Sequence, residues 1–222
     1  MTFGSNKTKK MRSIIIGAGT YSEVYLAYLL EAGIEVVGFV DDAPSLQRTF
    51  VRGYPVLGTV SALETLKSEK NVEAVYCPIG NNTVRVRMFK QAKAWGYKTP
   101  NYIHPSAVIS PHVEMGEGIY VLLGSHIMPH TKIEDYVMIS MNVNVAHHNL
   151  LEEGTFLSTG VNFGASITAH KRAYVGIGAT IMTGLHELGE DCLIGAGAVV
   201  IKDVPAKAIM AGVPAKVIRI KE

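Results

Sequence analysis

The chain has 222 residues, with 21 Lys and Arg against 19 Asp and Glu, so its formal net charge is only +2. The basic residues are scattered, and no basic stripe or aromatic ladder points to a nucleic-acid partner. No apolar run reaches the roughly eighteen residues of a membrane-spanning helix, and the N-terminus lacks the apolar core of a signal peptide. We therefore expect a cytoplasmic protein without a nucleic-acid or membrane partner. Its two cysteines, Cys77 and Cys192, are expected to be buried and reduced.

The first part of the chain predicts a small parallel α/β unit. Residues 1–12 are polar and Lys-rich, and we expect a flexible tail there. Residues 13–16 form an apolar run that predicts a strand, a glycine turn follows, and residues 36–40 predict a second strand. The helix expected between them has an apolar side made of Val24, Leu26, Ala27, Leu29 and Leu30. This order predicts a Rossmann-like βαβ unit.

The turn after the first strand carries a candidate nucleotide site, formed by Gly17, Ala18 and Gly19 together with Asp41 and Asp42. Glycines permit a tight turn that brings a phosphate to the helix N-terminus, where free N–H groups favour anions. The two carboxylates would accept hydrogen bonds from a ribose or a base. Because the third glycine of the usual pattern is Ser22, a purely structural tight turn stays open.

The rest of this unit predicts helices at residues 61–67 and 84–95 and a third strand at residues 74–79. About three parallel strands suit one mononucleotide half, which disfavours a dinucleotide-binding dehydrogenase. Gly80 and Asn81 follow the third strand at the edge where ligands bind in such sheets. Asn82 is expected to cap the helix, whereas Asn81 is a candidate for binding a base. We assign residues 13–100 to a Rossmann-like nucleotide-binding domain.

Residues 103–186 show a period of six, which neither a helix nor a hairpin explains. Such a hexad repeat is typical of a parallel β-helix, in which each coil uses three short strands. After the last regular hexad the register slips by one residue near residues 185–187, which predicts a displaced corner. We assign residues 101–222 to this all-β domain. The inward-facing positions predicted from the repeat are Ile103, Ile109, Met115, Val121, Ile127, Ile133, Ile139, Val145, Leu151, Leu157, Phe163, Ala169, Val175 and Ile181.

Adjacent histidines interrupt the pattern at His147 and His148, outside the inward positions. A histidine there can act as a general base near neutral pH. An ordinary exposed pair is the alternative, and most of the other histidines, among them His112 and His130, are expected to be surface residues. Several histidines on a β-helix could also bind zinc between subunits. No three of them show a ligand spacing, however, so we expect no metal.

Several short motifs in a fixed order resemble the bacterial nucleotide-sugar acetyltransferases of the NeuD and PglD type. The resemblance covers about residues 13–218. Its motifs are residues 16–19, 38–42, 79–82 and 103–107, the hexads, Ile194-Gly195-Ala196-Gly197-Ala198 and Gly212-Val213-Pro214-Ala215-Lys216.

The resemblance implies a homotrimer of left-handed β-helices, each preceded by a nucleotide-sugar-binding domain. It further implies that acetyl-coenzyme A is the acyl donor and lies along a groove between neighbouring β-helices. His147 would be the general base that takes a proton from the sugar amine, with direct transfer and no acyl-enzyme. The residues expected along the coenzyme groove are Phe156, Gly164, Ala165, Gly184 and Ala196.

Two departures from the family concern the catalytic residues. His148 stands where the family has an acidic partner for the base, which leaves two alternatives: His148 is itself the base, or Glu152 or Glu153 is the substitute acid. A second family histidine corresponds to Phe156.

We therefore expect an N-acetyltransferase that acts on a UDP-, GDP- or dTDP-linked 4-amino sugar in surface glycan synthesis. O-acetylation of a sugar or of sialic acid is the alternative within the class. A nicotinamide-dependent oxidoreductase and a non-catalytic trimeric scaffold are the alternatives from other classes.

Overall fold

The computed structural model describes residues 11–222. Most of the expected N-terminal tail, residues 1–10, lies outside the described residues. The chain divides into two compact units. Residues up to Ile79 together with Gln91–Thr99 form the first unit, and Gly80–Lys90 together with Pro100–Glu222 form the second. In the described part of the chain, no helix is both long and apolar enough to span a bilayer.

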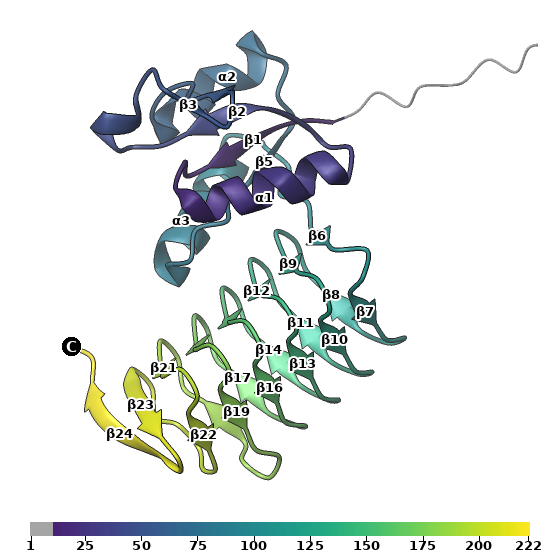
Figure 1. Ribbon diagram of the computed structural model, residues 1–222, viewed down its shortest axis with the longest axis vertical. Helices are drawn as coiled ribbons and strands as arrows, with labels where there is room; N and C mark the ends of the chain where they lie inside the picture. Colours follow the sequence, from purple (N-terminus) through teal and green to yellow (C-terminus); the bar gives the residue numbers. More distant parts are fainter. Residues whose placement is uncertain (1–10) are drawn as a thin grey trace, which may run out of the picture. The chain divides into compact units, whose positions relative to one another are not determined.

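A three-stranded parallel sheet forms the centre of the first unit, in the order β2-β1-β5. Its strands are β1 (Arg12–Ile16), β2 (Glu35–Val40) and β5 (Ala74–Tyr76), as Figure 1 shows. Ile14, Ile15 and Ile16 are fully buried, as expected for a strand covered on both faces. The expected βαβ unit with three parallel strands is therefore confirmed.

Helix α1 (Thr20–Glu31) connects β1 to β2. Its buried face consists of Ser22, Tyr25, Leu26 and Leu29, which are spaced three and four residues apart. The apolar side predicted from the sequence was partly wrong, because Val24 and Leu30 are both 40% exposed and Ala27 is exposed as well. The residue that replaces them on the inner face is Tyr25, whose ring packs edge-on against Tyr21 at 5.2 Å.

Two 3-10 turns, a short antiparallel strand pair and two helices complete the elements before the β-helix. The 3-10 turns η1 (Pro44–Leu46) and η2 (Val60–Ala62) flank the antiparallel pair β3 (Phe50–Val51) and β4 (Tyr54–Pro55). Helix α2 (Leu63–Glu69) follows η2, and helix α3 (Asn82–Ala94) follows β5. Both helices lie close to where the sequence predicts them.

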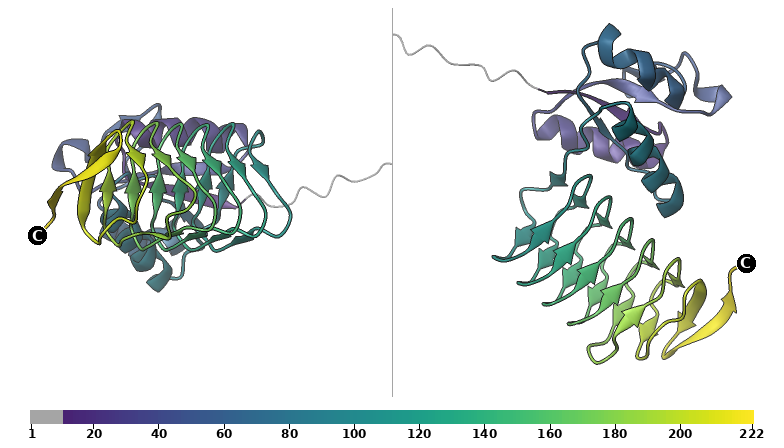
Figure 2. Two further views of the ribbon diagram at one scale, coloured as in Figure 1. Left: turned by 90° about the horizontal axis from the view of Figure 1, so that it is seen from below. Right: turned by 180° about the vertical axis from the view of Figure 1, so that it is seen from behind.

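The second unit contains a parallel β-helix with three sheets, whose successive coils are seen from three sides in Figures 1 and 2. The six-stranded face consists of β7 (Val108–Ile109), β10 (His126–Ile127), β13 (Asn144–Val145), β16 (Asn162–Phe163), β19 (Thr180–Ile181) and β22 (Val199–Val200). The five-stranded face consists of β8 (Glu114–Met115), β11 (Lys132–Ile133), β14 (Leu150–Leu151), β17 (Thr168–Ala169) and β20 (Glu187–Leu188). The eight-stranded face consists of β6 (Tyr102–Ile103), β9 (Tyr120–Val121), β12 (Met138–Ile139), β15 (Phe156–Leu157), β18 (Tyr174–Val175), β21 (Leu193–Ile194), β23 (Ala208–Gly212) and β24 (Ala215–Ile220).

The hexad residues form the interior, as the period of six predicts. From Val121 to Ile181 every one of them is at most 2% exposed. The first ones are an exception, since Ile103 is 39% exposed and Ile109 and Met115 are only half-buried. These residues belong to the first coil, which has a neighbouring coil on one side only.

The predicted register slip is confirmed at the corner after β19. Phe156 pairs with Tyr174, eighteen residues later, whereas Tyr174 pairs with Leu193, nineteen residues later. The extra residue is accommodated around Leu185, which turns inward and is 4% exposed. The chain then leaves the β-helix through the antiparallel pair β23 and β24.

Candidate active site

His147 and His148 occupy the corner between the six-stranded and the five-stranded face, which we call the His147 corner (residues 146–149). Both side chains are exposed. Their Nδ1 atoms lie 3.0 Å apart, within hydrogen-bonding distance, and their rings meet edge-on with centroids 5.1 Å apart. The structure therefore brings the two predicted catalytic residues into direct contact.

The backbone of the His147 corner is fixed by its neighbours in the stack. Asn149 is 2% exposed, and its side chain donates to the carbonyl of Ala146 and accepts from the N–H of Ile167. The carbonyl of His147 accepts from the N–H of Ser166 at 3.0 Å. Because every coil is hydrogen-bonded to the next, the two exposed imidazoles are presented from a rigid backbone.

Two more histidines lie in line with His148, one in each of the two preceding coils. The rings of His112 and His130 are stacked at 5.3 Å with an angle of 5° between their planes, and those of His130 and His148 lie 4.8 Å apart. We call His112, His130 and His148 the histidine column. From the sequence alone, His112 and His130 are expected to be surface residues. Their spacing of eighteen residues, one complete coil, was the signal that could have revealed the column.

The carboxylates considered as substitutes for the missing acidic partner have other partners. Glu152 accepts from Nδ1 of His170 at 3.1 Å and from the N–H of Lys171 at 3.0 Å. Glu153 forms an ion pair with Lys90 at 2.8 Å. Glu152 and Glu153 lie at the next corner of the coil and not at the His147 corner. The expectation that one of them orients His147 is therefore wrong.

A hollow of about 370 Å³ runs along the six-stranded face beside the His147 corner. Ala146, Phe163 and Gly164 line it, together with the asparagines Asn144 and Asn162, whose side chains are hydrogen-bonded at 2.9 Å. Of the residues expected along the coenzyme groove, Gly164 thus borders a real cavity. A side chain at Gly164 would meet the backbone of the next coil, since a Cβ atom would lie 2.5 Å from the nitrogen of Thr183.

The other residues expected along the groove are distributed over several corners. Ala165 is buried, and its N–H donates to the hydroxyl of Thr183 at 3.1 Å. Gly184 lies at the corner with the inserted residue, and Ala196 is exposed at a corner next to the eight-stranded face. Phe156 lies on the eight-stranded face, is 6% exposed and packs edge-on against Tyr174. The contacts of Phe156 are those of a packing residue.

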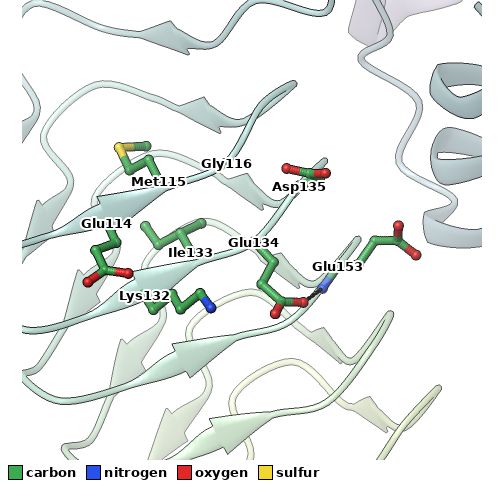
Figure 3. A pocket seen from close by; sticks show the side chains of 8 residues that line it. All are labelled: Glu114, Met115, Gly116, Lys132, Ile133, Glu134, Asp135 and Glu153. Carbon is green, nitrogen blue, oxygen red and sulfur yellow. Dashed lines mark hydrogen bonds between the residues drawn. The ribbon is translucent and has the colours of Figure 1, made fainter. Parts of the chain in front are cut away.

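A second hollow, of about 430 Å³, is lined by β8, β11 and the corners that follow them. Glu114, Glu134, Asp135 and Glu153 line it with a single lysine, Lys132, as Figure 3 shows. Glu134 accepts a hydrogen bond from the N–H of Glu153 at 3.2 Å, drawn as the dashed line in the figure. This excess of carboxylates repels phosphate groups and makes the hollow unsuited to coenzyme A.

The glycine turn of the first unit is tight at Gly17. Gly17 has φ +92°, and a Cβ atom there would lie 3.2 Å from Ile79 and 3.5 Å from the hydroxyl of Ser22. Helix α1 begins after Gly19 without a side-chain cap, and the N–H groups of Ser22 and Glu23 donate to the carbonyl of Gly19. Ser22, which replaces the third glycine, is 3% exposed and fits into the turn.

The two aspartates after β2 hold the backbone around this turn. Asp41 accepts from the N–H of Ala18 at 2.7 Å and from that of Ala43 at 2.8 Å. Asp42 accepts from the N–H of Val60 at 2.9 Å. These carboxylates therefore shape the loop, and a role in contacting a ribose or a base stays a prediction.

The capping role expected of Asn82 belongs to Asn81. Asn81 caps the helix, since its side chain accepts from the N–H of Val84 at 3.0 Å. Asn82 is buried and instead donates to the carbonyl oxygens of Arg172 and Ala173 in the β-helix. Gly80 and Asn81 are exposed, and both line a hollow of about 270 Å³ together with Arg172 and Tyr174.

Neither cysteine is placed to act as a nucleophile. Cys77 and Cys192 are both fully buried and unbridged. Burial raises the pKa of the Cys192 thiol to about 12, so this group stays protonated. Within residues 11–222, no cluster of three or more His, Cys, Asp or Glu side chains is arranged to bind a metal ion.

Comparisons with known proteins agree over nearly the whole chain. The profile of the PglD N-terminal domain matches residues 12–92. The crystal structure of PerB from Caulobacter crescentus, in complex with CoA and GDP-perosamine, has a TM-score of 0.85 and 34% sequence identity, covering 92% of this chain and 96% of PerB. The acetyltransferase domain of PglB from Neisseria gonorrhoeae, in complex with acetyl coenzyme A, has a TM-score of 0.85 and 29% identity, covering 94% of this chain and 100% of that domain.

Curated relatives match over shorter segments. The 2,3,4,5-tetrahydropyridine-2,6-dicarboxylate N-acetyltransferase of Enterococcus faecalis is 42% identical over 55 residues, which are 25% of this chain and 23% of that protein. The chain spans about a quarter of the length of the curated relatives it matches. The match to PerB, in contrast, extends over more than nine tenths of both chains at 34% identity, and the profile match covers residues 12–92. The chain therefore belongs to the PglD-type family of nucleotide-sugar N-acetyltransferases with a β-helix.

Proposed function

We propose that this protein transfers the acetyl group of acetyl-coenzyme A to the amine of a nucleotide-linked 4-amino sugar. The observation that carries the proposal is the 34% identity to PerB, whose structure contains CoA and GDP-perosamine, over 92% of this chain. The PglB domain, with acetyl coenzyme A bound, supports the same acyl donor. Surface glycan synthesis is the process in which we place the product.

His147 serves as the general base. The attacking amine must lose a proton as its nitrogen bonds to the thioester carbonyl carbon, and an exposed imidazole at a rigid corner is suited to accept it. The carbon–sulfur bond then breaks, and the protonated His147 returns the proton to the departing thiolate. The proton taken from the amine thus ends on the coenzyme A thiol, and His147 returns to its neutral starting state.

Direct transfer between the two substrates fits the chemistry of the chain. An acyl-enzyme needs an accessible nucleophile such as a thiolate. The only two cysteines of the chain are fully buried. Catalysis then rests on holding the amine and the thioester together beside His147, which can supply several orders of magnitude in rate.

The hollow along the six-stranded face is the place we assign to part of the coenzyme. It begins at the His147 corner, contains Gly164 and carries no carboxylate among its lining residues. The sugar nucleotide is assigned to the glycine turn of the first unit, with Gly17, Ala18, Gly19, Asp41, Asp42, Gly80 and Asn81 as its candidate contacts. The protein is expected to act in the cytoplasm as a homotrimer, with active sites shared between subunits.

Purified full-length protein tests the proposal directly. Release of the coenzyme A thiol should require both acetyl-coenzyme A and a UDP-, GDP- or dTDP-linked 4-amino sugar, and mass spectrometry should find one added acetyl group. A ligand present at a hundred times its Kd should also stabilise the fold by about 2.7 kcal/mol, which a thermal shift detects. Absence of transfer with all three nucleotide series would refute the assigned substrate class.

The alternatives give different results in the same assays. An O-acetyltransferase would acetylate a hydroxyl acceptor and ignore the amino sugar when the two are offered side by side. A nicotinamide-dependent oxidoreductase would change the fluorescence of NADH or NADPH on binding. A scaffold would be stabilised neither by acetyl-coenzyme A nor by any nucleotide sugar.

A further inference from the structure

The histidine column is built into three successive coils. His112, His130 and His148 occupy equivalent corner positions with φ of +62°, +63° and +56°, a conformation that few non-glycine residues adopt. Backbone hydrogen bonds connect these corners, from the N–H of His130 to the carbonyl of His112 and from the N–H of His148 to the carbonyl of Pro129. The backbone thus places the imidazoles above one another, ending at the residue that contacts His147.

We propose that the histidine column positions His147 and takes up the positive charge that His147 acquires during acetyl transfer. In this arrangement His148 is the direct partner of His147, and His130 is a positioning residue that holds the ring of His148. The inference rests on the proposed function insofar as it concerns turnover. The state of the imidazoles themselves can be tested separately.

The contact between the two Nδ1 atoms restricts the protonation of His147. A hydrogen bond over 3.0 Å between two ring nitrogens requires one of them to carry a proton and the other a lone pair. When Nδ1–H of His147 donates to Nδ1 of His148, the lone pair of His147 lies at Nε2. That nitrogen is then free to accept the proton of the amine, as a base must.

The column also provides a path for the charge. Once Nε2 of His147 takes the amine proton, the ring carries a positive charge, and its Nδ1 proton can move to Nδ1 of His148. The charged ring of His148 then packs against the ring of His130, tilted by 35° with the centroids 4.8 Å apart, where the π electrons stabilise a cation. Both protons move back when Nε2 of His147 protonates the thiolate, so nothing is gained or lost overall.

The charged side chains beside the histidine column carry opposite charges. Glu114 and Lys132 line a hollow together with His112 and His130 and bring one charge of each sign. Two neighbouring imidazoliums would repel each other, so a single added charge is the state that the stack favours. The column therefore differs from a carboxylate partner, which neutralises the protonated base instead of sharing its charge.

Steady-state kinetics of the full-length protein test the column through substitutions that keep the unusual backbone. Asparagine tolerates positive φ, so His148→Asn and His130→Asn remove the rings at little backbone cost. We expect kcat to fall roughly 10- to 100-fold for His148→Asn and roughly 3- to 10-fold for His130→Asn, with KM for both substrates nearly unchanged. His148→Asp should restore much of kcat, because a carboxylate accepts the same Nδ1–H. His104→Asn removes an imidazole at a corner outside the column and is the control, which should leave kcat unchanged.

A double-mutant cycle separates positioning from a structural role. If His130 and His148 act through His147, their substitution should have no further effect on the residual rate of His147→Ala. An equal loss in both backgrounds would overturn the proposal, as would full activity of His148→Asn and His130→Asn in the native background.

Nitrogen-15 NMR of the imidazoles gives a reading that does not depend on turnover. In the native protein Nε2 of His147 should be unprotonated and Nδ1 protonated, and His148→Asn should abolish this preference. The opposite tautomer in the native protein would overturn the inference even if acetyl transfer is observed. Should no acetyl transfer occur at all, the proposed function fails, whereas the tautomer still decides the positioning role.

Discussion

Arg85 donates a hydrogen bond from its guanidinium to the carbonyl oxygen of Gly154 at 2.7 Å, although the two residues are 69 positions apart. The same guanidinium donates to the carbonyl of Tyr136 and to the side chain of Asn82, and it lies 5.7 Å from the centre of the Phe156 ring. Arg85 is fully buried. The single guanidinium on helix α3 thus donates hydrogen bonds to backbone carbonyls at two corners of the β-helix.

Replacing Arg85 by Met should destabilise the fold strongly. The substitution retains most of the apolar stem but leaves buried acceptors without a donor, at a cost of about 3 kcal/mol. Thermal unfolding should show a Tm lower by several degrees. Arg87→Met is the matched control, because Arg87 is exposed on the same helix and should tolerate the change. Equal stability of the two variants would contradict the role of Arg85.

Two corner glycines allow the free-energy cost of a positive φ to be measured separately from the cost of a steric clash. Gly154 and Gly178 have φ of +72° and +64°, but a Cβ atom at Gly154 would lie 2.4 Å from the side chain of Val86, whereas Gly178 has open space. Gly178→Ala should therefore cost about 1 kcal/mol for the backbone alone. Gly154→Ala should cost roughly 1–3 kcal/mol more, since the β-branched Val86 cannot turn away easily. Chemical denaturation of both variants measures the difference, which should vanish if Val86 moves freely.

Removing the proposed base should affect catalysis without affecting the fold. His147→Ala is expected to lower kcat by about 10²–10⁴-fold, the usual contribution of general-base catalysis. Because His147 is exposed, the Tm and the circular dichroism spectrum should match those of the native protein. A variant that retains its turnover would show that another group removes the proton.

His170 should make the stability of the β-helix depend on pH. Burial lowers the pKa of His170, but the hydrogen bonds that its ring donates to Glu187 and Glu152, each at 3.1 Å, outweigh burial, and the pKa is raised. A raised pKa means that the folded state binds the proton more tightly. The stabilisation is therefore complete below the ordinary pKa of histidine and is lost as the pH rises through the raised value.

Thermal melts of His170→Gln and of the native protein between pH 6 and pH 9 check this expectation. The difference in Tm should be largest near pH 6 and should shrink toward pH 9. A difference that stays constant over this range would mean that the ring contributes by packing alone. His104→Gln, at a corner outside this cluster, serves as the control for loss of an imidazole.

The interior of the β-helix could be predicted almost residue by residue. A β-helix repeats its burial pattern every six residues, so positions such as Val121 and Leu157 are recognisable without any contact information. The shift of one residue near Leu185 was recognisable for the same reason, because an insertion displaces every later hexad. The βαβ order was similarly visible, although the inner face of α1 was misjudged at Val24 and Leu30.

Contacts between distant segments could not be predicted in this way. Asn81 and Asn82 have the same side-chain chemistry, and only the packing of Asn82 against Arg172 decides which of them caps the helix. Glu152 was a plausible partner for His147 by distance along the chain. Adjacent corners of one coil point in different directions, however, and Glu152 is held by His170.

Helix α3 has a further consequence for how this protein can be divided. Its first part, Gly80–Lys90, belongs to the compact unit of the β-helix, although the chain reaches the first coil only after Pro100. Expression of residues 101–222 alone would remove Arg85 from the carbonyls of Tyr136 and Gly154 and uncover Phe156. The acyltransferase part should therefore be recoverable as a stable fragment only if it begins ahead of residue 80, or if residues 80–90 are supplied as a separate peptide.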